Sequence, residues 1–367
     1  MFEMNMDDAL DEHIRISAEK GISQNQIKQL LLKAGWPESQ VTSYIGKNFK
    51  KLEKGIILRA HGLSKNFNEH QVLSNIDFEI RSGEIFGLIG MSGAGKTTLL
   101  NLLVGFLKPD QGDVVMALQD GTTQSVYKNP HLIRQHIGFS TQTPSFYSKL
   151  TVRENLEHFA HLYHLTEPDL TRRCNALLDL VGLADAKDAI SLHLSGGMQK
   201  RLDIACALLH DPNILVLDEP TADLDPVLRK QFWELIKQIN QKGTTIILAS
   251  HFLAEIELLC TRIAILQNKT IAELGTAEEL RNIYSKNYEI YLTTKSHDYG
   301  QILAELEKRK RYFVKATQKA GELIIETPVP EQILPLLSSY LEKGRDVQSL
   351  HVERPTLGKV FESVVRR

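Results

Sequence analysis

The chain has 367 residues, of which 42% are apolar and 24% are charged, and its formal net charge is −2. This length allows two or three domains, and the composition excludes a disordered chain. Without a large basic excess we expect no nucleic-acid partner, and no stretch approaches the ~20 continuous apolar residues that a membrane-spanning helix needs.

Residues 1–54 are predicted to form a small helical unit. Their acidic start has no apolar run of the kind that a secretory signal contains, so we expect none. Ser23–Gln26 matches a capping box that opens a second helix after Gly21, and a third helix follows the turn at Gly35–Ser39. The three short helices around Trp36 weakly resemble a ubiquitin-associated bundle. The unit is either a docking module for a partner or an appendage that packs on its neighbour.

From residue 55 to about residue 285, strand-like runs alternate with helical segments. The strand-like runs include Ile85–Gly90, Ile214–Asp218 and Thr244–Ser250. Near-continuous apolar strands separated by helices are typical of a mainly parallel sheet covered on both faces, which places this part in the α/β class. Between about residues 144 and 194 only helical patterns occur, which indicates a helical insertion.

Residues 286–367 show a different, α+β rhythm. Strand-like runs begin at Tyr288, Tyr312, Gly321 and Val347, with helical patterns between the first two and between the last two. The order β-α-β-β-α-β predicts a small ferredoxin-like domain. A last amphipathic helix follows at Thr356–Val365.

The run "GLIGMSGAGKTTLL" has the pattern G-x-x-x-x-G-K-T directly after a strand and at the start of a helix. Its glycines are Gly90 and Gly95, and they allow the backbone to curl so that successive N–H groups face phosphates. Lys96 can reach the β- and γ-phosphates of a nucleotide, and the hydroxyl of Thr97 can hold Mg²⁺. The strand–loop–helix context argues against a chance glycine-rich turn.

Two further strands end in side chains that suit phosphate chemistry. The strand "ILVLD" ends in Asp218 and is followed by Glu219, and burying adjacent acids is costly unless they meet a cation or a reacting group. Asp218 suits the Mg²⁺ shell, and Glu219 suits the orientation or deprotonation of an attacking water, although in isolation the pair could be a helix cap. The strand "TIILAS" delivers His251 at the sheet edge where α/β proteins bind ligands.

With these motifs in order, the chain resembles an ATP-binding-cassette ATPase from about Ile56 to Leu280. The resemblance implies that Phe67 stacks on adenine and that Asp225 lies in a loop that crosses a dimer. It implies that the nucleotide is bound by the following residues: Phe67, Gly90, Ser92, Gly93, Ala94, Gly95, Lys96, Thr97, Thr98 and Gln142. It assigns the metal to Thr97, Gln142 and Asp218, and catalysis to Glu219, His251 and Lys96. In the signature "LSGGMQ", it directs Ser195, Gly196, Gly197 and Gln199 toward the γ-phosphate bound by another cassette.

The same resemblance implies an enzyme that hydrolyses ATP with Mg²⁺. It implies that the chain closes around two ATP molecules as a homodimer, or as a pair with a second cassette. This dimer would drive a separate transmembrane permease from the cytoplasmic face of the cell membrane, and Gln142 would sense this permease. The ending "LHVERPTLGKVFESVV" is similar to the accessory domain of single-cassette exporters. A cassette protein acting on ribosomes or DNA is an alternative, but such proteins usually carry two cassettes or a coiled coil. A regulatory scaffold is another, which intact Glu219 and His251 argue against.

Three places depart from the family pattern, one of which, Ser140-Thr141 before Gln142, leaves the glutamine in place. Phe67 stands where tyrosine is common; its ring can still stack, although it could instead be an ordinary core aromatic. Asp223 stands where a small residue is usual, and because aspartate tolerates a left-handed backbone we expect the turn to form.

Two sets of metal-type residues fall outside these motifs. Three histidines share one helical pattern but would spread over about 120° of its surface, which disfavours a metal site formed by His158, His161 and His164. The three cysteines lack metal-ligand spacing and are interpreted as small core residues: Cys174, Cys206 and Cys260.

Overall fold

The computed structural model describes residues 31–32, 55–117, 123–128, 130–284, 287–319, 321–342, 347–354 and 356–365. The helical unit predicted for residues 1–54 therefore lies outside the described residues, apart from Leu31 and Leu32, which are helical, with Leu31 buried. Within these ranges, no helix has both the length and the apolar character needed to cross a bilayer.

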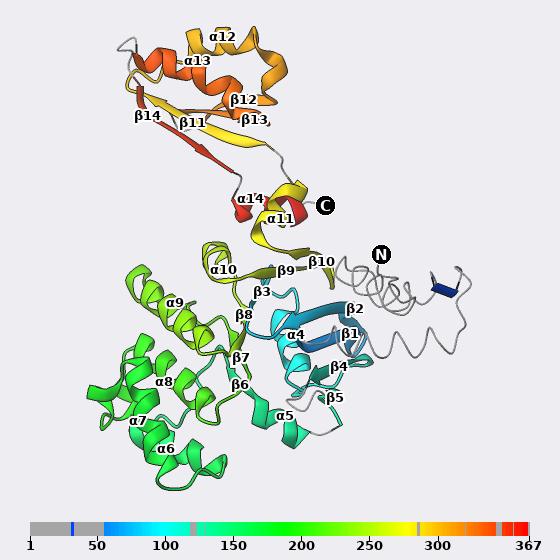
Figure 1. Ribbon diagram of the computed structural model, residues 1–367, viewed down its shortest axis with the longest axis vertical. Helices are drawn as coiled ribbons and strands as arrows, with labels where there is room; N and C mark the ends of the chain where they lie inside the picture. Colours follow the sequence, from blue (N-terminus) through cyan, green and yellow to red (C-terminus); the bar gives the residue numbers. More distant parts are fainter. Residues whose placement is uncertain are drawn as a thin grey trace, which may run out of the picture.

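A six-stranded sheet occupies the centre of the structure (Figure 1). In spatial order it consists of β10 (Thr270–Gly275), β9 (Arg262–Gln267), β3 (Ile85–Gly90), β8 (Thr245–Ala249), β7 (Ile214–Asp218) and β6 (Ile137–Ser140). Every neighbouring pair is parallel except β10 with β9, which confirms the mainly parallel prediction. The predicted bounds of β3 and β7 are confirmed, and β8 is one residue shorter at each end. These strands are buried on both faces, as their near-continuous apolar sequences require.

One face of this sheet is covered by a second, antiparallel sheet that the sequence pattern did not indicate. In spatial order it consists of β2 (His70–Arg81), β1 (Ile56–Phe67), β4 (Gln111–Ala117) and β5 (Thr123–Ser125). Helix α4 (Lys96–Leu103) completes this layer, and its Leu99 joins Leu58 and Ile76 of the antiparallel sheet in one buried cluster with Phe86. This layer anchors the strand that ends at Phe67 and the loop that precedes α4.

Helices cover the other face (Figure 1). They are α6 (Val152–Leu162), α7 (Asp169–Val181), α8 (Gly196–Leu208), α9 (Pro226–Gln241) and α10 (Leu253–Leu259), with short 3₁₀ turns η1 (Ala184–Ala186) and η2 (Ser191–His193). Helix α5 (Pro130–His136) leads into β6. Helix α6 begins with a capping box between Thr151 and Glu154. It ends at Leu162, so the expectation that His164 lies on the same helix as His158 is wrong.

The C-terminal strands and helices form the predicted ferredoxin-like arrangement. Its antiparallel sheet has the order β12 (Lys315–Lys319), β13 (Glu322–Thr327), β11 (Tyr288–Thr294) and β14 (Val347–Glu353). Helices α12 (Gly300–Glu307) and α13 (Pro330–Glu342) contribute to its core, and η3 (Lys310–Tyr312) precedes β12, which starts later than predicted.

The last helix, α14 (Leu357–Val365), returns to the larger unit, and the sequence does not indicate this return. Figure 1 shows it beside α11 (Ala277–Tyr284), below the C-terminal sheet. Its Leu357 and Val360 are buried in the same cluster as Leu280 and Ile256. The C-terminal unit is therefore tied to the larger unit at both of its ends.

Candidate functional site

The glycine-rich loop joins β3 to α4 in a conformation that requires its glycines. Gly93 and Gly95 have positive φ angles of 77° and 103°. A Cβ atom on Gly90 would lie 2.8 Å from the carbonyl oxygen of Leu266, and one on Gly95 would lie 3.0 Å from Val72. The loop leads directly into the N-terminus of α4, whose first backbone N–H groups suit an anion.

Lys96, the first residue of α4, lies largely buried inside this loop. Its ammonium group donates to the carbonyl oxygens of Gly90 at 3.0 Å and Met91 at 3.3 Å. It also lies 3.7 Å from a carboxylate oxygen of Glu219. The side chain thus holds the loop closed from within and presents its charge at the end of β7.

Thr97 and Asp218 form the next contact of the site. The hydroxyl of Thr97 donates to Oδ2 of Asp218 at 2.8 Å, and Asp218 is 2% exposed. The other oxygen, Oδ1, is buried without a hydrogen-bond partner within the described structure. Burial raises the pKa of Asp218, and the hydrogen bond from Thr97 opposes this rise. An orphaned carboxylate oxygen beside a hydroxyl is a donor set that suits a hard divalent cation such as Mg²⁺.

Glu219 and His251 contact each other across the ends of β7 and β8. Nδ1 of His251 and Oε2 of Glu219 lie 2.6 Å apart, and the backbone N–H of His251 also donates to Oε2 at 3.3 Å. Because an ionised carboxylate only accepts, Nδ1 carries the hydrogen of this bond. The backbone of Glu219 is left-handed, with φ of 50°, and its N–H donates to the carbonyl oxygen of Ala249 at 2.9 Å. Such a conformation is strained for a non-glycine residue and is enriched at functional sites.

The structure therefore brings together five predicted residues, which come from the start of helix α4 and the ends of two neighbouring strands, β7 and β8: Lys96, Thr97, Asp218, Glu219 and His251. Gly90 adjoins this cluster through the hydrogen bond that it accepts from Lys96. The predicted residues that contact other parts of the chain are Phe67, Gln142, Ser195, Gln199 and Asp225.

Phe67 lies at the end of β1 and is 47% exposed, so its interpretation as an ordinary core aromatic is wrong. The ammonium group of Lys65 lies 5.7 Å from the centre of its ring. Gln142 is also exposed, in the loop after β6.

The signature residues surround the N-terminus of α8. Ser195 caps this helix by accepting from the backbone N–H of Met198 at 3.4 Å. A Cβ on Gly196 would meet no atom within 4 Å, so the backbone here faces open space. The amide of Gln199 donates to the carbonyl oxygen of Leu194 at 3.2 Å, which directs this side chain toward its own loop.

Asp225 acts as a helix cap in this structure. Its carboxylate accepts from the backbone N–H groups of Val227 at 2.8 Å and Leu228 at 3.0 Å, at the start of α9. The expected turn before it forms, but Asp223 does not adopt the left-handed backbone that aspartate tolerates; the left-handed residue is Glu219. Asp223 and Asp225 are both exposed.

Sequence reasoning missed two charged residues of α8 that hold the loop around Gln142. Asp203 accepts from the hydroxyl of Ser140 at 2.5 Å and from the backbone N–H of Ser145 at 2.6 Å. Lys200 donates to the carbonyl oxygen of Gln142. Burial raises the pKa of Asp203 and lowers that of Lys200. The available signal was the placement of these charges in an otherwise apolar helical run.

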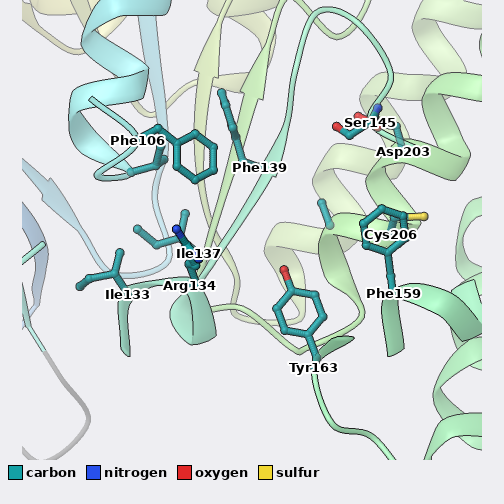
Figure 2. A pocket seen from close by; sticks show the side chains of 12 residues that line it. Phe106, Ile133, Arg134, Ile137, Phe139, Ser145, Phe159, Tyr163, Asp203 and Cys206 are labelled. Atoms are coloured by element: carbon teal, nitrogen blue, oxygen red, sulfur yellow. Dashed lines mark hydrogen bonds between the residues drawn. The ribbon is translucent and has the colours of Figure 1, made fainter. Parts of the chain in front are cut away.

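A cavity of about 310 Å³ lies beside this loop (Figure 2). Its walls come from α5, β6, α6, α8 and the segments after α4 and β6, and the lining side chains include Phe106, Phe139, Ser145, Phe159, Tyr163 and Asp203. The ring of Phe106 is 60% exposed and packs edge-on against Phe139, with centroids 5.5 Å apart. The cavity is therefore largely apolar, with four aromatic rings in its lining, and shares Ser145 and Asp203 with the hydrogen bonds around Gln142.

Among the described residues, no group of three or more histidine, cysteine or acidic side chains could hold a metal. The ring of His158 instead packs edge-on against Tyr147, with centroids 4.8 Å apart. Cys174 and Cys206 are buried and Cys260 is partly buried, in agreement with their interpretation as core residues.

Comparisons with known proteins give a consistent answer. The sequence profile of the family described as "ABC transporter" matches residues 73–222. The chain is 30% identical over 313 residues to the linearmycin resistance ATP-binding protein LnrL of Bacillus subtilis, a match that covers 85% of this chain and 99% of that protein. It is 34% identical over 303 residues to the Nod factor export ATP-binding protein I of a Rhizobium species, covering 82% of this chain and 94% of that one. A solved ATP-binding subunit of an ABC transporter superposes with a TM-score of 0.56 at 30% identity, covering 62% of this chain and 93% of that chain.

Proposed function

Because the chain belongs to the ABC transporter family as an ATP-binding, ATP-hydrolysing subunit, we propose that it powers export through a separate permease and that the five-residue cluster is its hydrolytic site. The observation that supports the site most directly is the contact of Lys96, Glu219 and His251 at the carboxyl ends of three parallel strands. This is the edge at which α/β sheets bind ligands.

Each residue of the cluster has a role that its contacts support. Lys96 carries the charge that meets the β- and γ-phosphates, exchanging its two carbonyl acceptors for phosphate oxygens. Glu219 accepts a hydrogen bond from the attacking water, and the bond to His251 fixes the direction of its carboxylate. Thr97 and Asp218 hold Mg²⁺, which when bound offsets the negative charge of the phosphates.

Replacing Glu219 tests this assignment. We expect Glu219→Gln to lower the rate of ATP hydrolysis by about 10²-fold or more while ATP binding remains, because the amide cannot take up the proton of the water. Glu234→Gln, an exposed change of the same kind on α9, should leave the rate unchanged. A Glu219→Gln variant that hydrolyses ATP at the normal rate would remove this residue from the mechanism.

We further propose that two copies of the chain, or one copy and a second cassette, close around two ATP molecules. Ser195, Gly196 and Gly197 would then face the γ-phosphate bound by the other cassette, and the open backbone at Gly196 supports such an approach. The Glu219→Gln variant should form dimers with ATP and Mg²⁺ by size-exclusion chromatography with light scattering. Dimers that persist in Ser195→Arg with Gly196→Asp would contradict this arrangement.

The apolar cavity beside the Gln142 loop is the docking site that we propose for the permease, at the cytoplasmic face of the cell membrane. Subunits of this family work with transmembrane permeases, and the cavity joins exposed aromatic surface to the loop that carries Gln142. Phe106→Asp should abolish co-purification with the partner permease, whereas Val314→Asp, equally exposed on the C-terminal unit, should not. Retained co-purification in Phe106→Asp would place the docking surface elsewhere.

Export as the direction rests on the relatives, whose names are those of resistance and export proteins, and on the C-terminal unit. Cells lacking the chain should accumulate a substrate of the permease, and expression of the intact chain but not Glu219→Gln should reverse this.

The N-terminal residues 1–54 remain a proposed docking module. A chain that starts at residue 55 should keep its ATPase activity; loss of that activity would favour an appendage that stabilises its neighbour.

A further inference from the structure

Glu255, in the first turn of α10, is a fully buried acid that the mechanism above does not use. Its Oε2 atom accepts from the hydroxyl of Ser250 at 2.6 Å. Its Oε1 atom accepts from the hydroxyl of Thr221 at 2.9 Å and from the indole N–H of Trp233 at 2.8 Å. One carboxylate thus joins three segments of the chain that lie apart in sequence.

Two of the three donors adjoin Glu219 and His251, the two residues that we propose to act in hydrolysis. Ser250 immediately precedes His251, and Thr221 lies two residues after Glu219. The hydroxyl of Ser250 also accepts a hydrogen bond from the backbone N–H of Phe252 at 3.1 Å. Because Ser250 and Phe252 flank His251, this bond fixes the backbone before and after His251. Trp233 lies in the middle of α9 and connects the carboxylate to a long helix. Glu255 therefore links the loops after β7 and β8 to each other and to a rigid element.

Stability alone does not account for an acid in this place. Burial raises the pKa of Glu255, an effect that the hydrogen bonds from Ser250, Thr221 and Trp233 oppose. A buried charge of this kind is often replaceable by an apolar side chain at little or no cost in stability. What an apolar side chain does not provide is a fixed distance between two hydroxyl groups on separate loops.

We infer that Glu255 is a positioning residue, which holds the loops of Glu219 and His251 at the separation that their 2.6 Å contact requires. This inference rests on the proposed roles of Glu219 and His251 in hydrolysis. The carboxylate acts through Thr221 and Ser250 and does not itself touch the reacting atoms. A displacement of about 1 Å in such a pair is enough to lower a rate by about 10²-fold.

Thr221 offers a matched pair of variants. Thr221→Val keeps the shape of the side chain but removes the hydroxyl, whereas Thr221→Ser keeps the hydroxyl. We expect Thr221→Val to lower kcat about tenfold with KM for ATP nearly unchanged, and Thr221→Ser to retain kcat within about twofold. Trp233→Phe, which removes the third donor but leaves both loops tied to Glu255, is the control and should retain kcat. Glu255→Gln is a second route to the same test, provided that its thermal unfolding stays cooperative.

A double-mutant cycle separates positioning from general destabilisation. In a His251→Ala background the pair no longer exists, so Thr221→Val should have little further effect on kcat. An equal loss in both backgrounds, or an equal loss in Thr221→Ser and Thr221→Val, would overturn the inference.

A spectroscopic measurement keeps this inference distinct from the proposed function. With ¹⁵N-labelled histidine, the Nδ1–H proton of His251 should resonate downfield because of its short bond to Glu219. The resonance should be lost in Thr221→Val and kept in Thr221→Ser. If His251→Ala hydrolysed ATP normally, the proposed catalytic role would fail, whereas an unchanged resonance in Thr221→Val would refute the positioning role itself.

Discussion

His210 makes the stability of the chain sensitive to acid. The residue follows α8, its ring stacks on Tyr163 with centroids 4.0 Å apart, and Nε2 lies 3.3 Å from the carbonyl oxygen of Ile137. Nδ1 is buried without a hydrogen-bond partner within the described residues. Burial lowers the pKa of His210 from 6.5 to about 4; the carbonyl of Ile137 and Asp211 oppose this shift, and Arg173 adds to it.

The direction and size of the effect follow from these two pKa values. As the pH falls below 6.5, the unfolded chain takes up a proton on His210 before the folded chain does. The contribution to stability is therefore complete above pH 6.5 and is lost as the pH falls toward 4. Linkage gives a loss of about 2 kcal/mol at pH 5 and about 3 kcal/mol below pH 4.

Urea unfolding of matched variants measures this contribution. His210→Phe keeps the stacked ring but cannot be protonated. When the pH is lowered from 7.5 to 5, the free energy of unfolding should therefore decrease by about 2 kcal/mol less in this variant than in the unchanged chain. The chain has two tryptophans, and we replace one of them, Trp36, by phenylalanine in all variants. The fluorescence of the other, Trp233 on α9, then reports on the unit that contains His210. His70→Phe, an exposed change, is the control. An identical pH dependence in His210→Phe and the unchanged chain would refute the reasoning.

Three further substitutions have defined outcomes. Asp203→Ala should lower the free energy of unfolding in urea by about 2–4 kcal/mol, because the hydroxyl of Ser140 and the N–H of Ser145 lose their acceptor; an unchanged value would mean that water replaces the carboxylate. Gly138→Ala should cost about 1–3 kcal/mol in the same assay, since its Cβ would overlap the carbonyl oxygen of Ala207 on α8, and full stability would show that β6 and α8 separate easily. Phe67→Leu should weaken ATP binding by about tenfold in calorimetry and Phe67→Tyr should not, because stacking needs a ring face; equal binding by all three would exclude stacking.

The sequence predicted the central strands and the side chains presented at their ends because both signals are local. Residues 85–90 and 214–217 are uninterrupted apolar runs, the pattern that is typical of a strand buried on both faces. The loop with Lys96 and Thr97 was readable because the spacing of its glycines is fixed by the backbone that surrounds a phosphate. Local signals of this kind identify which side chains are presented at the sheet edge.

Contacts between distant segments left no comparable signal. The antiparallel sheet was missed because β1 and β2 contain polar and charged residues throughout, and their pairing depends on register shifts that no short window reveals. The contact of Asp203 with Ser140 spans 63 residues, and that of Glu255 with Thr221 spans 34. The left-handed backbone of Glu219 could not be predicted from the sequence either. Aspartate tolerates this conformation better than glutamate does, so the residue type pointed to Asp223 and not to Glu219.

The contacts of the five-residue cluster, which we propose as the hydrolytic site, also determine what ATP would have to replace. In this structure the ammonium group of Lys96 is bound by two carbonyl oxygens and lies near Glu219, and Glu219 is bound by His251. A phosphate that takes over Lys96 therefore breaks existing bonds, and only the difference between the two sets of contacts contributes to affinity. The negative charge that develops on the oxygen between the β- and γ-phosphates, as its bond to the γ-phosphorus breaks, strengthens the new contacts relative to the carbonyl contacts they replace, so the exchange favours the transition state over the bound substrate. Lys96 should accordingly contribute more to kcat than to the affinity for ATP.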